Sequence, residues 1–415
     1  MPPRSGGGTV SADGDLPAVV AGAGPVGLAA ALALRRLGHE VIVLEAEPRE
    51  RPRAGSRAIY VHGATLRLLE GVSPGLGHAM AERGVVWSGK RTFWKGRQIY
   101  GRHYAPPAPG RLPHFTSLPQ VVSDRLLLDA CEAMRVQIAW STPLRSLTAD
   151  RDGVTVLGAG REWRARYVVG ADGARSAVRQ AIGVSLSGPR PRNAYVVVDV
   201  ADDPSHPLPC ERVFHYLHPG VGHRNVLLVP FAGGWRVDLQ CRVDDDLDHL
   251  ATPDGVRSWL VEVLLPGHSL DVTWVSTYRF LQVVAERFTD EHRRVLLAGE
   301  AAHLFAPFGA RGMNSGIADA VAAARAIHLA LQEGDPQSRR RVIDGLSGDR
   351  RASALYNRDA AGKALRHMQA SDPWIRVTRA VAARLARRSC RVGAWMDSAP
   401  YGPRRGRVGM TSAKY

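Results

Sequence analysis

The sequence predicts an α/β protein in which a Rossmann-like domain is interlocked with an antiparallel-sheet domain and followed by C-terminal helices. Three patterns predict this fold class. A compact strand-helix-strand unit occupies residues 17–45, and short alternating strands follow one another in residues 193–285. Beyond residue 336 the chain is rich in arginine, with apolar residues at helical spacing.

The strand-helix-strand unit carries Gly22, Gly24 and Gly27 in GxGxxG spacing, where its first strand ends and its helix begins. Gly22 permits the turn, Gly24 lets the backbone approach a pyrophosphate, and Gly27 lets the helix pack on the strand. Glu45 ends the second strand, where its carboxylate can accept both ribose hydroxyls. The glycine spacing alone is weak evidence, but within this unit it predicts a dinucleotide site.

A later strand, ending near Gly170, leads into a turn with Asp172 and Gly173 at its tip. Two interpretations stay open from the residues alone. Asp172 either supports a ligand or caps the following helix, with Arg175 and Arg179 then forming a solvated helix face.

Residues 295–320 join a buried strand to a helix through the turn Gly299-Glu300 and a glycine-rich loop at 309–314. A helix amino terminus stabilises an anion, which suits a negatively charged reduced flavin ring. Glu300 can accept a hydrogen bond from a sugar-like hydroxyl. The alternative is an ordinary strand, loop and core helix.

Taken in order, GAGPVG, ADGARSAVR and GEAAHLFAPFGARGMN resemble the single-component FAD-dependent aromatic hydroxylases, typified by p-hydroxybenzoate hydroxylase and phenol hydroxylase. The resemblance runs from about residue 17 to about residue 331. It implies bound FAD, NADPH or NADH as transient reductant, O2 as cosubstrate, and hydroxylation of an aromatic, phenolic small molecule through a flavin C4a-hydroperoxide. Baeyer–Villiger insertion or epoxidation on the same fold is the alternative reaction. A non-enzymatic FAD-fold protein and a simple NAD-binding module are the alternative classes.

The resemblance also implies site residues. The cofactor-binding positions are Gly22, Gly24, Gly27, Glu45, Arg57, Gln120, Arg125, Asp172, Glu300, Gly312, Met313 and Asn314. Arg57, Gln120 and Arg125 reach the phosphate and ribitol side, and residues 312–314 hold the pyrimidine edge. Without the resemblance to the family, Arg57, Gln120 and Arg125 would be interpreted as surface positions. Pro307 packs near the ring, and no metal site is expected.

Four positions depart from the family's pattern or invite a different role. Glu300 replaces the usual aspartate, so the ribitol contact is expected from an acid one methylene longer. Phe308 and Arg311 are expected near the reacting edge, where they would influence substrate choice. His303 is interpreted as structural, because this chemistry needs no histidine base.

In the antiparallel region, the segment WRVDLQC alternates and places Arg236, Asp238 and Gln240 on one face. That face either meets water or roofs a substrate pocket over the flavin, and Arg236 and Asp238 are therefore catalytic candidates alongside Pro307. Further candidate pocket residues are Tyr195, His215, Arg224 and Phe305.

The expected division of the chain follows from these patterns. Residues 1–16 form a loose tail, 17–192 the FAD-binding domain with inserted strands around 85–120, 193–285 the substrate domain, 286–335 the return to the FAD-binding domain, and 336–415 a helical region.

The composition limits which kinds of partner and which cellular location are expected. The net charge is +16, carried almost entirely by arginine, but the arginines are dispersed and no nucleic-acid motif accompanies them, so nucleic acid is not expected as a partner. Four scattered cysteines fit a reducing cytoplasm, and no apolar run is long enough to span a membrane. A homodimer and an acidic carrier-protein partner stay open.

Near the C-terminus, Trp374, Val377, Val381 and Leu385 recur at helical spacing among arginines. We expect an amphipathic helix that packs this face on the core. A helix lying on a membrane surface is the alternative.

Overall fold

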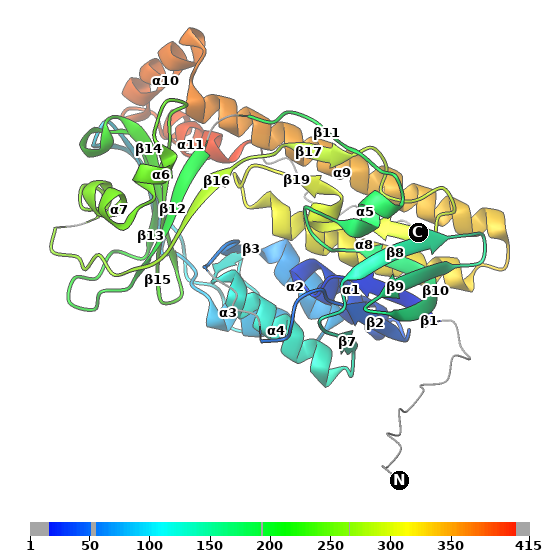
Figure 1. The fold of residues 1–415 in the computed structure, drawn as a ribbon. Helices are drawn as coiled ribbons and strands as arrows, with labels where there is room; N and C mark the ends of the chain where they lie inside the picture. The colour runs from blue at the N-terminus through cyan, green and yellow to red at the C-terminus, as the bar shows by residue number, and fades with distance from the viewer. Residues whose placement is uncertain (1–15, 51–54, 192–193, 265, 404–415) are drawn as a thin grey trace.

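The structure is a computed structural model that describes residues 16–50, 55–191, 194–264 and 266–403. Of the predicted tail at residues 1–16, residues 1–15 lie outside these ranges, and Leu16 begins strand β1. The described chain is a mixed α/β fold built on two large sheets, joined by a long helix (Figure 1), and the predicted fold class is confirmed.

The nucleotide-fold sheet has the strand order β7-β2-β1-β10-β9-β8, with β18 beside β10. Its strands are β1 (Leu16–Ala21), β2 (Val41–Leu44), β7 (Gln137–Ala139), β8 (Leu144–Ala149), β9 (Val154–Gly158), β10 (Arg161–Gly170) and β18 (Val295–Leu297). β1 pairs in parallel with β2 and β10, and β18 pairs in parallel with β10. The carboxyl ends of these strands, which lead into the glycine turn, Asp172 and Glu300, therefore meet at one edge of the sheet.

Helices cover one face of this sheet: α1 (Pro25–Arg36), α2 (Gly63–Val72), α3 (Leu76–Arg83), α4 (Gln120–Ala133) and α8 (Arg311–Gln332). α1 and α8 both contribute alanine- and leucine-rich faces to a common core with β1. Helix α8 begins at Arg311, inside the segment 309–314 that was expected to be a loop.

The second large sheet has the order β16-β12-β15-β14-β13-β4-β5. Its strands are β4 (Gly89–Trp94), β5 (Arg97–His103), β12 (Ala194–Ala201), β13 (Glu211–His218), β14 (Arg224–Phe231), β15 (Gly234–Gln240) and β16 (Val272–Arg279). β4 and β5 come from the segment expected to insert from residues 85–120. Alternation along β12 sends Val196 and Val198 to a core under α6 (Leu247–Leu250) and α7 (Pro253–Leu260), and Tyr195 and Val197 to the opposite core.

The opposite core lies against the C-terminal helices α9 (Pro336–Gln369), α10 (Pro373–Ala386) and α11 (Cys390–Ser398). α9 is about 50 Å long at 1.5 Å per residue, and Figure 1 shows it running alongside both sheets. The remaining elements are β3 (Tyr60–His62), β6 (Phe115–Ser117), α5 (Ala177–Ala181), β11 (Leu186–Ser187), β17 (Val283–Ala285), β19 (His303–Leu304) and the 3-10 turns η1 (Pro219–Val221), η2 (Gly299–Ala301) and η3 (Ala399–Tyr401). No helix in the described ranges has the length and apolarity needed to cross a bilayer.

Candidate active site

The glycine turn is tightly packed at two of its glycines and open at the third. A Cβ on Gly22 (φ +100°) would lie 2.5 Å from the Ala171 carbonyl oxygen, and one on Gly27 would lie 1.9 Å from that of Gly22. A Cβ on Gly24 would meet no atom within 4 Å. Close packing therefore requires glycine at 22 and 27, whereas the space at Gly24, at the amino end of α1, is the space a pyrophosphate needs.

Glu45 is buried beside this turn. Its Oε2 accepts a hydrogen bond from the Ala23 amide at 2.6 Å, and its Oε1 accepts one from the Glu47 amide at 3.0 Å. The carboxylate is thus held where β2 ends, next to the glycine turn, as the predicted ribose-binding acid requires.

Asp172 has both features that the sequence left open. Its Oδ2 accepts a hydrogen bond from the Val178 amide at 3.0 Å, at the start of α5, so it does cap that helix. Its Oδ1 is buried without a partner among the described residues. The turn lies beside the glycine turn, since the Ala171 amide donates to the Ala21 carbonyl. One carboxylate oxygen therefore stays available to a ligand.

The loop before α8 ends in two residues with positive φ, Gly309 (+79°) and Ala310 (+53°). The amides of Gly312 and Met313, in the first turn of α8, have no backbone acceptor among the described residues. A Cβ on Gly312 would meet nothing within 4 Å. Free amides at a helix start, facing open space, suit the electron-rich edge of a flavin ring, so these residues fit the cofactor.

The side chains of Asn314 and Arg311, next to Gly312 and Met313, make hydrogen bonds within the protein. Asn314 Oδ1 accepts from the His62 amide and the Thr65 hydroxyl, while its Nδ2 donates to the Tyr60 and Ala310 carbonyls. The side chain of Asn314 is therefore a clamp for the loop, and only its backbone can serve the pyrimidine edge.

Arg311 corrects an expectation. Its guanidinium is buried away from the reacting edge, where it donates to Asn357 Oδ1 at 2.8 Å and to the Tyr401 and Pro403 carbonyls at 3.1 Å. Because α8 begins at Arg311, this side chain turns toward α9 and fixes the loop from behind.

The loop at residues 55–58, here called the Arg57 loop, is held by the antiparallel sheet. Asp199 accepts hydrogen bonds from the Ser56 amide at 2.9 Å and the Ser56 hydroxyl at 2.7 Å. Arg236 lies 3.5 Å from Asp199 and donates to the Ser56 hydroxyl and to the Arg57 carbonyl. Arg236 was expected to line the substrate pocket, but these contacts assign it to positioning the loop.

Arg57 itself is exposed with φ +45°, a strained conformation for arginine. It lies near Glu300, whose pKa is raised because desolvation by the surrounding protein outweighs the attraction of His303 and Arg57. Glu300 nevertheless keeps solvent contact. A strained cation and an accessible acid at the edge of the nucleotide-fold sheet are suited to polar groups of a ligand.

Gln120 and Arg125 differ in their surroundings. Gln120 Oε1 accepts from the Ala58 amide at 3.3 Å, which ties the start of α4 to the Arg57 loop. Arg125 is exposed and forms an ion pair with Asp129 at 2.8 Å. The cofactor contact of Arg125 stays a prediction.

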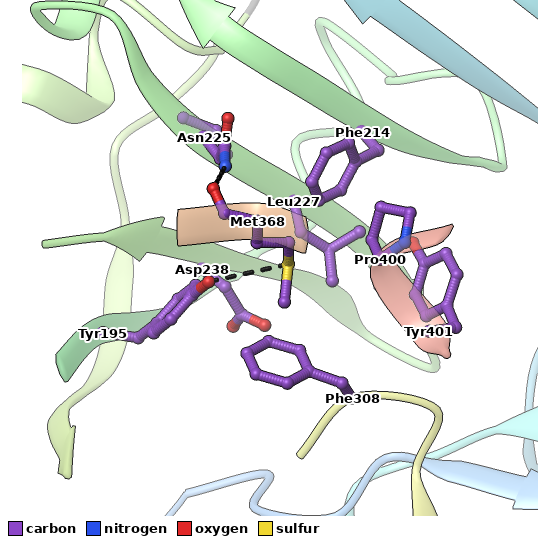
Figure 2. A pocket seen from close by; sticks show the side chains of 10 residues that line it. Tyr195, Phe214, Asn225, Leu227, Asp238, Phe308, Met368, Pro400 and Tyr401 are labelled. Atoms are coloured by element: carbon purple, nitrogen blue, oxygen red, sulfur yellow. Dashed lines mark hydrogen bonds between the residues drawn. The ribbon is translucent and has the colours of Figure 1, made fainter. Parts of the chain in front are cut away.

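A small cavity of about 20 Å³ lies between the antiparallel sheet, the end of α9 and the loop that precedes α8. Figure 2 shows Tyr195, Asp238, Met368 and Phe308 converging on it. Its lining residues are Tyr195, Phe214, Asn225, Val226, Leu227, Asp238, Phe308, Met368, Pro400 and Tyr401. Apolar and aromatic groups around a few polar ones are typical of a small-molecule site.

Asp238 is the chemically distinctive group in this cavity. Its Oδ1 is buried and has no partner among the described residues. Burial raises the pKa of Asp238 to about 6, with Arg236 opposing the rise and Asp199 adding to it. Burial also raises the pKa of Tyr195, whose hydroxyl lies 3.6 Å from the Met368 sulfur. Of the polar face of β15, Asp238 therefore lines a cavity, whereas Arg236 and Gln240 are not among its lining residues.

Other candidate pocket residues lie elsewhere. Arg224 pairs with Asp245, and His215 stacks on Phe93 on the far face of the sheet. Phe305 stacks on His303 with ring centroids 4.5 Å apart. Asn225, on β14, and Met368, on α9, line the cavity but were not predicted. Met368 could not be predicted locally, because α9 reaches this sheet only through the tertiary fold. A lone acid within a run of valines, such as Asp199, is a signal that sequence reasoning could have used.

His303 is buried beneath the loop that precedes α8, where it interacts with Asp319 and, through it, with Arg350. Its Nε2 lies 2.7 Å from Asp319 Oδ2, and Arg350 Nε donates to Asp319 Oδ1 at 2.6 Å. Asp319 Oδ2 also accepts from the Gly299 amide at 3.2 Å. These contacts support the structural interpretation of His303 and explain how α8, α9 and the Glu300 turn are locked together.

Asp319→Asn is expected to destabilise the protein by about 3–5 kcal/mol at pH 7, because Arg350 would lose its buried partner. Burial opposes ionisation of Asp319, but Arg350 and His303 outweigh it and lower the pKa. The stability contributed by the carboxylate is therefore present above the ordinary pKa of about 4 and is lost as pH falls through the lower folded value. Urea unfolding at pH 7 and at about pH 3, below the ordinary carboxyl pKa, measures this, with Asp349→Asn, an exposed residue next to Arg350 in the sequence, as control; equal stability of both variants at pH 7 would contradict it.

Comparison with known proteins agrees with this geometry. A family model described as FAD binding domain matches residues 15–354. The 6-methylpretetramide 4-monooxygenase of Streptomyces rimosus is 32% identical over 77% of this chain and 55% of its own length. The para-nitrophenol 4-monooxygenase of Pseudomonas sp. (strain WBC-3) is 31% identical over 86% of this chain and 89% of its own length. Several matched relatives are much longer, and this chain spans about half of them.

Solved structures give the same result. The p-nitrophenol 4-monooxygenase PnpA of Pseudomonas putida DLL-E4 superposes with a TM-score of 0.75 at 28% identity, covering 94% of this chain and 99% of that one. The flavin-dependent monooxygenase PieE, solved with FAD and substrate, shares the fold with a TM-score of 0.76 at 22% identity. As the three motifs predicted, the chain belongs to the FAD binding domain family, among the flavoprotein monooxygenases of the p-hydroxybenzoate hydroxylase type.

Proposed function

We propose that the chain is an FAD-dependent, NAD(P)H-consuming monooxygenase that hydroxylates a small aromatic, phenolic substrate. The observation that carries the proposal is the position of the cavity. Phe308 belongs to the loop that opens α8 and also lines the cavity that contains Asp238. A substrate in this cavity would therefore lie close to a ring held at Gly312 and Met313.

The groups that would hold FAD form a continuous path along the sheet edge. Gly24 and Glu45 would hold the adenosine and pyrophosphate end, Asp172 and Glu300 the polar middle, and the amides of Gly312 and Met313 the ring. When bound and reduced, the flavin activates O2 and provides the oxygen atom, with electrons from NAD(P)H.

The protein's own residues would prepare the substrate. The unpartnered Asp238 carboxylate would accept a hydrogen bond, and then the proton, from the phenol, which makes the aromatic ring more electron-rich. Phe308, Phe214 and Leu227 would exclude water from the cavity. Pro307 would pack beside the ring, and Arg236 would keep the Arg57 loop in place.

A cytoplasmic location belongs to the same proposal. It is supported by the cysteines, since Cys131, Cys210, Cys241 and Cys390 are all free thiols.

The test is to load the purified chain with FAD and measure NADH and NADPH oxidation with a panel of hydroxybenzoates, phenylpropanoids and polyketide phenols. The proposal expects faster oxidation with a phenol and a product that gains one oxygen atom from ¹⁸O2 on the ring. An oxygen inserted beside a carbonyl or across a double bond would instead indicate Baeyer–Villiger insertion or epoxidation. Protein that cannot be loaded with FAD would refute the proposal.

A further inference from the structure

Helix α10 turns its large apolar side chains outward. Trp374, Val377, Val381 and Leu385 are 78%, 54%, 48% and 49% exposed. The face packed on the protein consists instead of Arg379, Ala382, Ala383 and Ala386. The expectation that this face packs on the core is therefore wrong, because the alanine face allows closer approach of the helix. We call the four exposed residues the α10 stripe.

The orientation of α10 is fixed from below by Arg379. This buried guanidinium donates to the His367 and Met368 carbonyls at 3.1 Å. It also lies over the rings of Trp94 and Tyr216, at 5.5 and 4.8 Å from their centroids. Rotating the stripe inward would withdraw Arg379 from all four contacts, so the stripe is held at the surface.

Cations accompany the stripe. Arg384 follows Val381 by three positions, which places it beside the stripe on the helix surface. Arg388 lies in the turn that follows α10, where its amide donates to the Leu385 carbonyl. Arg376 and Arg387 are also exposed, and α10 contains no acidic residue. Across the described ranges, no ion pair engages these four arginines. The α10 stripe is therefore an apolar surface flanked by available positive charge.

We infer that the α10 stripe docks on the surface of an anionic lipid bilayer. Tryptophan and aliphatic side chains beside arginines are typical of helices that lie in the membrane interface, with the apolar face among the acyl chains and the cations at acidic headgroups. Figure 1 shows α10 at the extremity of the molecule, beyond the antiparallel sheet, where a flat bilayer can reach it.

A second copy of the chain fits this surface less well. The stripe extends from Trp374 to Leu385, about 17 Å of one helix, whereas a stable protein interface buries about 800 Å² per partner. Pairing two stripes would also bring arginines of two molecules, each with a net charge of +16, into proximity. The inference does not depend on the reaction that the chain catalyses.

The test is co-sedimentation of the full FAD-loaded chain with phosphatidylcholine vesicles that either contain or lack phosphatidylglycerol. We expect binding only to the anionic vesicles, weakened by salt. The variant Val377→Gln/Val381→Gln/Leu385→Gln should lower the vesicle partition coefficient on the order of 10-fold or more, and Arg384→Gln/Arg388→Gln should reduce the salt dependence. Val243→Gln/Val261→Gln removes two equally exposed valines elsewhere and should leave binding unchanged.

Two results would overturn the inference. One is absence of sedimentation with anionic vesicles, or sedimentation that the triple glutamine variant retains while circular dichroism shows it folded. The other is a dimer in light scattering that the triple variant converts to a monomer, which would assign the stripe to a second copy instead.

Discussion

Gly312→Val is expected to abolish FAD binding while leaving the protein folded. The Cβ of residue 312 would meet no protein atom within 4 Å, so valine is accommodated by the fold and fills only the open space in front of the α8 amides. We expect FAD affinity to fall on the order of 100-fold or more, measured by quenching of FAD fluorescence on titration. The melting temperature of the FAD-free protein should barely change.

Two glycines provide the controls. Gly348 lies exposed in α9, also with nothing within 4 Å of its Cβ, so Gly348→Val should keep both fold and FAD. Gly27→Val should instead destabilise the protein itself, because its Cβ would lie 1.9 Å from the Gly22 carbonyl oxygen. Normal FAD binding by folded Gly312→Val would mean that the flavin ring does not lie at the start of α8.

Asp238→Asn is expected to lower kcat/KM for a phenolic substrate by about 100-fold, the usual range for losing a group that takes a proton in the reaction. Burial raises the pKa of Asp238 to about 6, and the proton-accepting form is the carboxylate. Activity of the unmodified chain should therefore rise as pH increases through about 6. In the asparagine variant this step should be absent, which steady-state kinetics between pH 5 and 8 would show.

The folding stability of the unmodified protein should change with pH in the opposite direction to its activity. Between the ordinary carboxyl pKa of about 4 and the folded value near 6, unfolding releases the Asp238 proton, so the stability of the unmodified protein falls as pH rises across this window. Asparagine removes that cost, and at pH 7 the variant should be more stable by up to about 3 kcal/mol. Asp199→Asn is the matched contrast: it should be destabilising, since Asp199 holds Ser56 and Arg236. An Asp238→Asn variant that is less stable and fully active would contradict the proposed role.

Local sequence patterns were sufficient to predict the nucleotide-fold sheet and its turns. The glycines at 22 and 27 are required by contacts within a few residues of the turn or with the adjoining strand end. Glu45 directly follows β2, which is apolar and buried throughout, and Asp172 lies two residues after the buried end of β10. The alternation of β15 also predicted which face Asp238 occupies, because successive side chains in a strand point to opposite faces.

The sequence by itself thus predicted where the chain would hold FAD and determined which face of the second sheet is polar, since both depend on turn geometry and strand periodicity. Only the tertiary structure decided what each polar or apolar group meets across the fold. It sends Arg311 toward α9, assigns Arg236 to the Arg57 loop, and leaves Asp238 Oδ1 without a partner among the described residues. It also turns the α10 stripe outward, because a helix with both an alanine face and a larger apolar face can pack by either one, and the buried site for Arg379 selects the first.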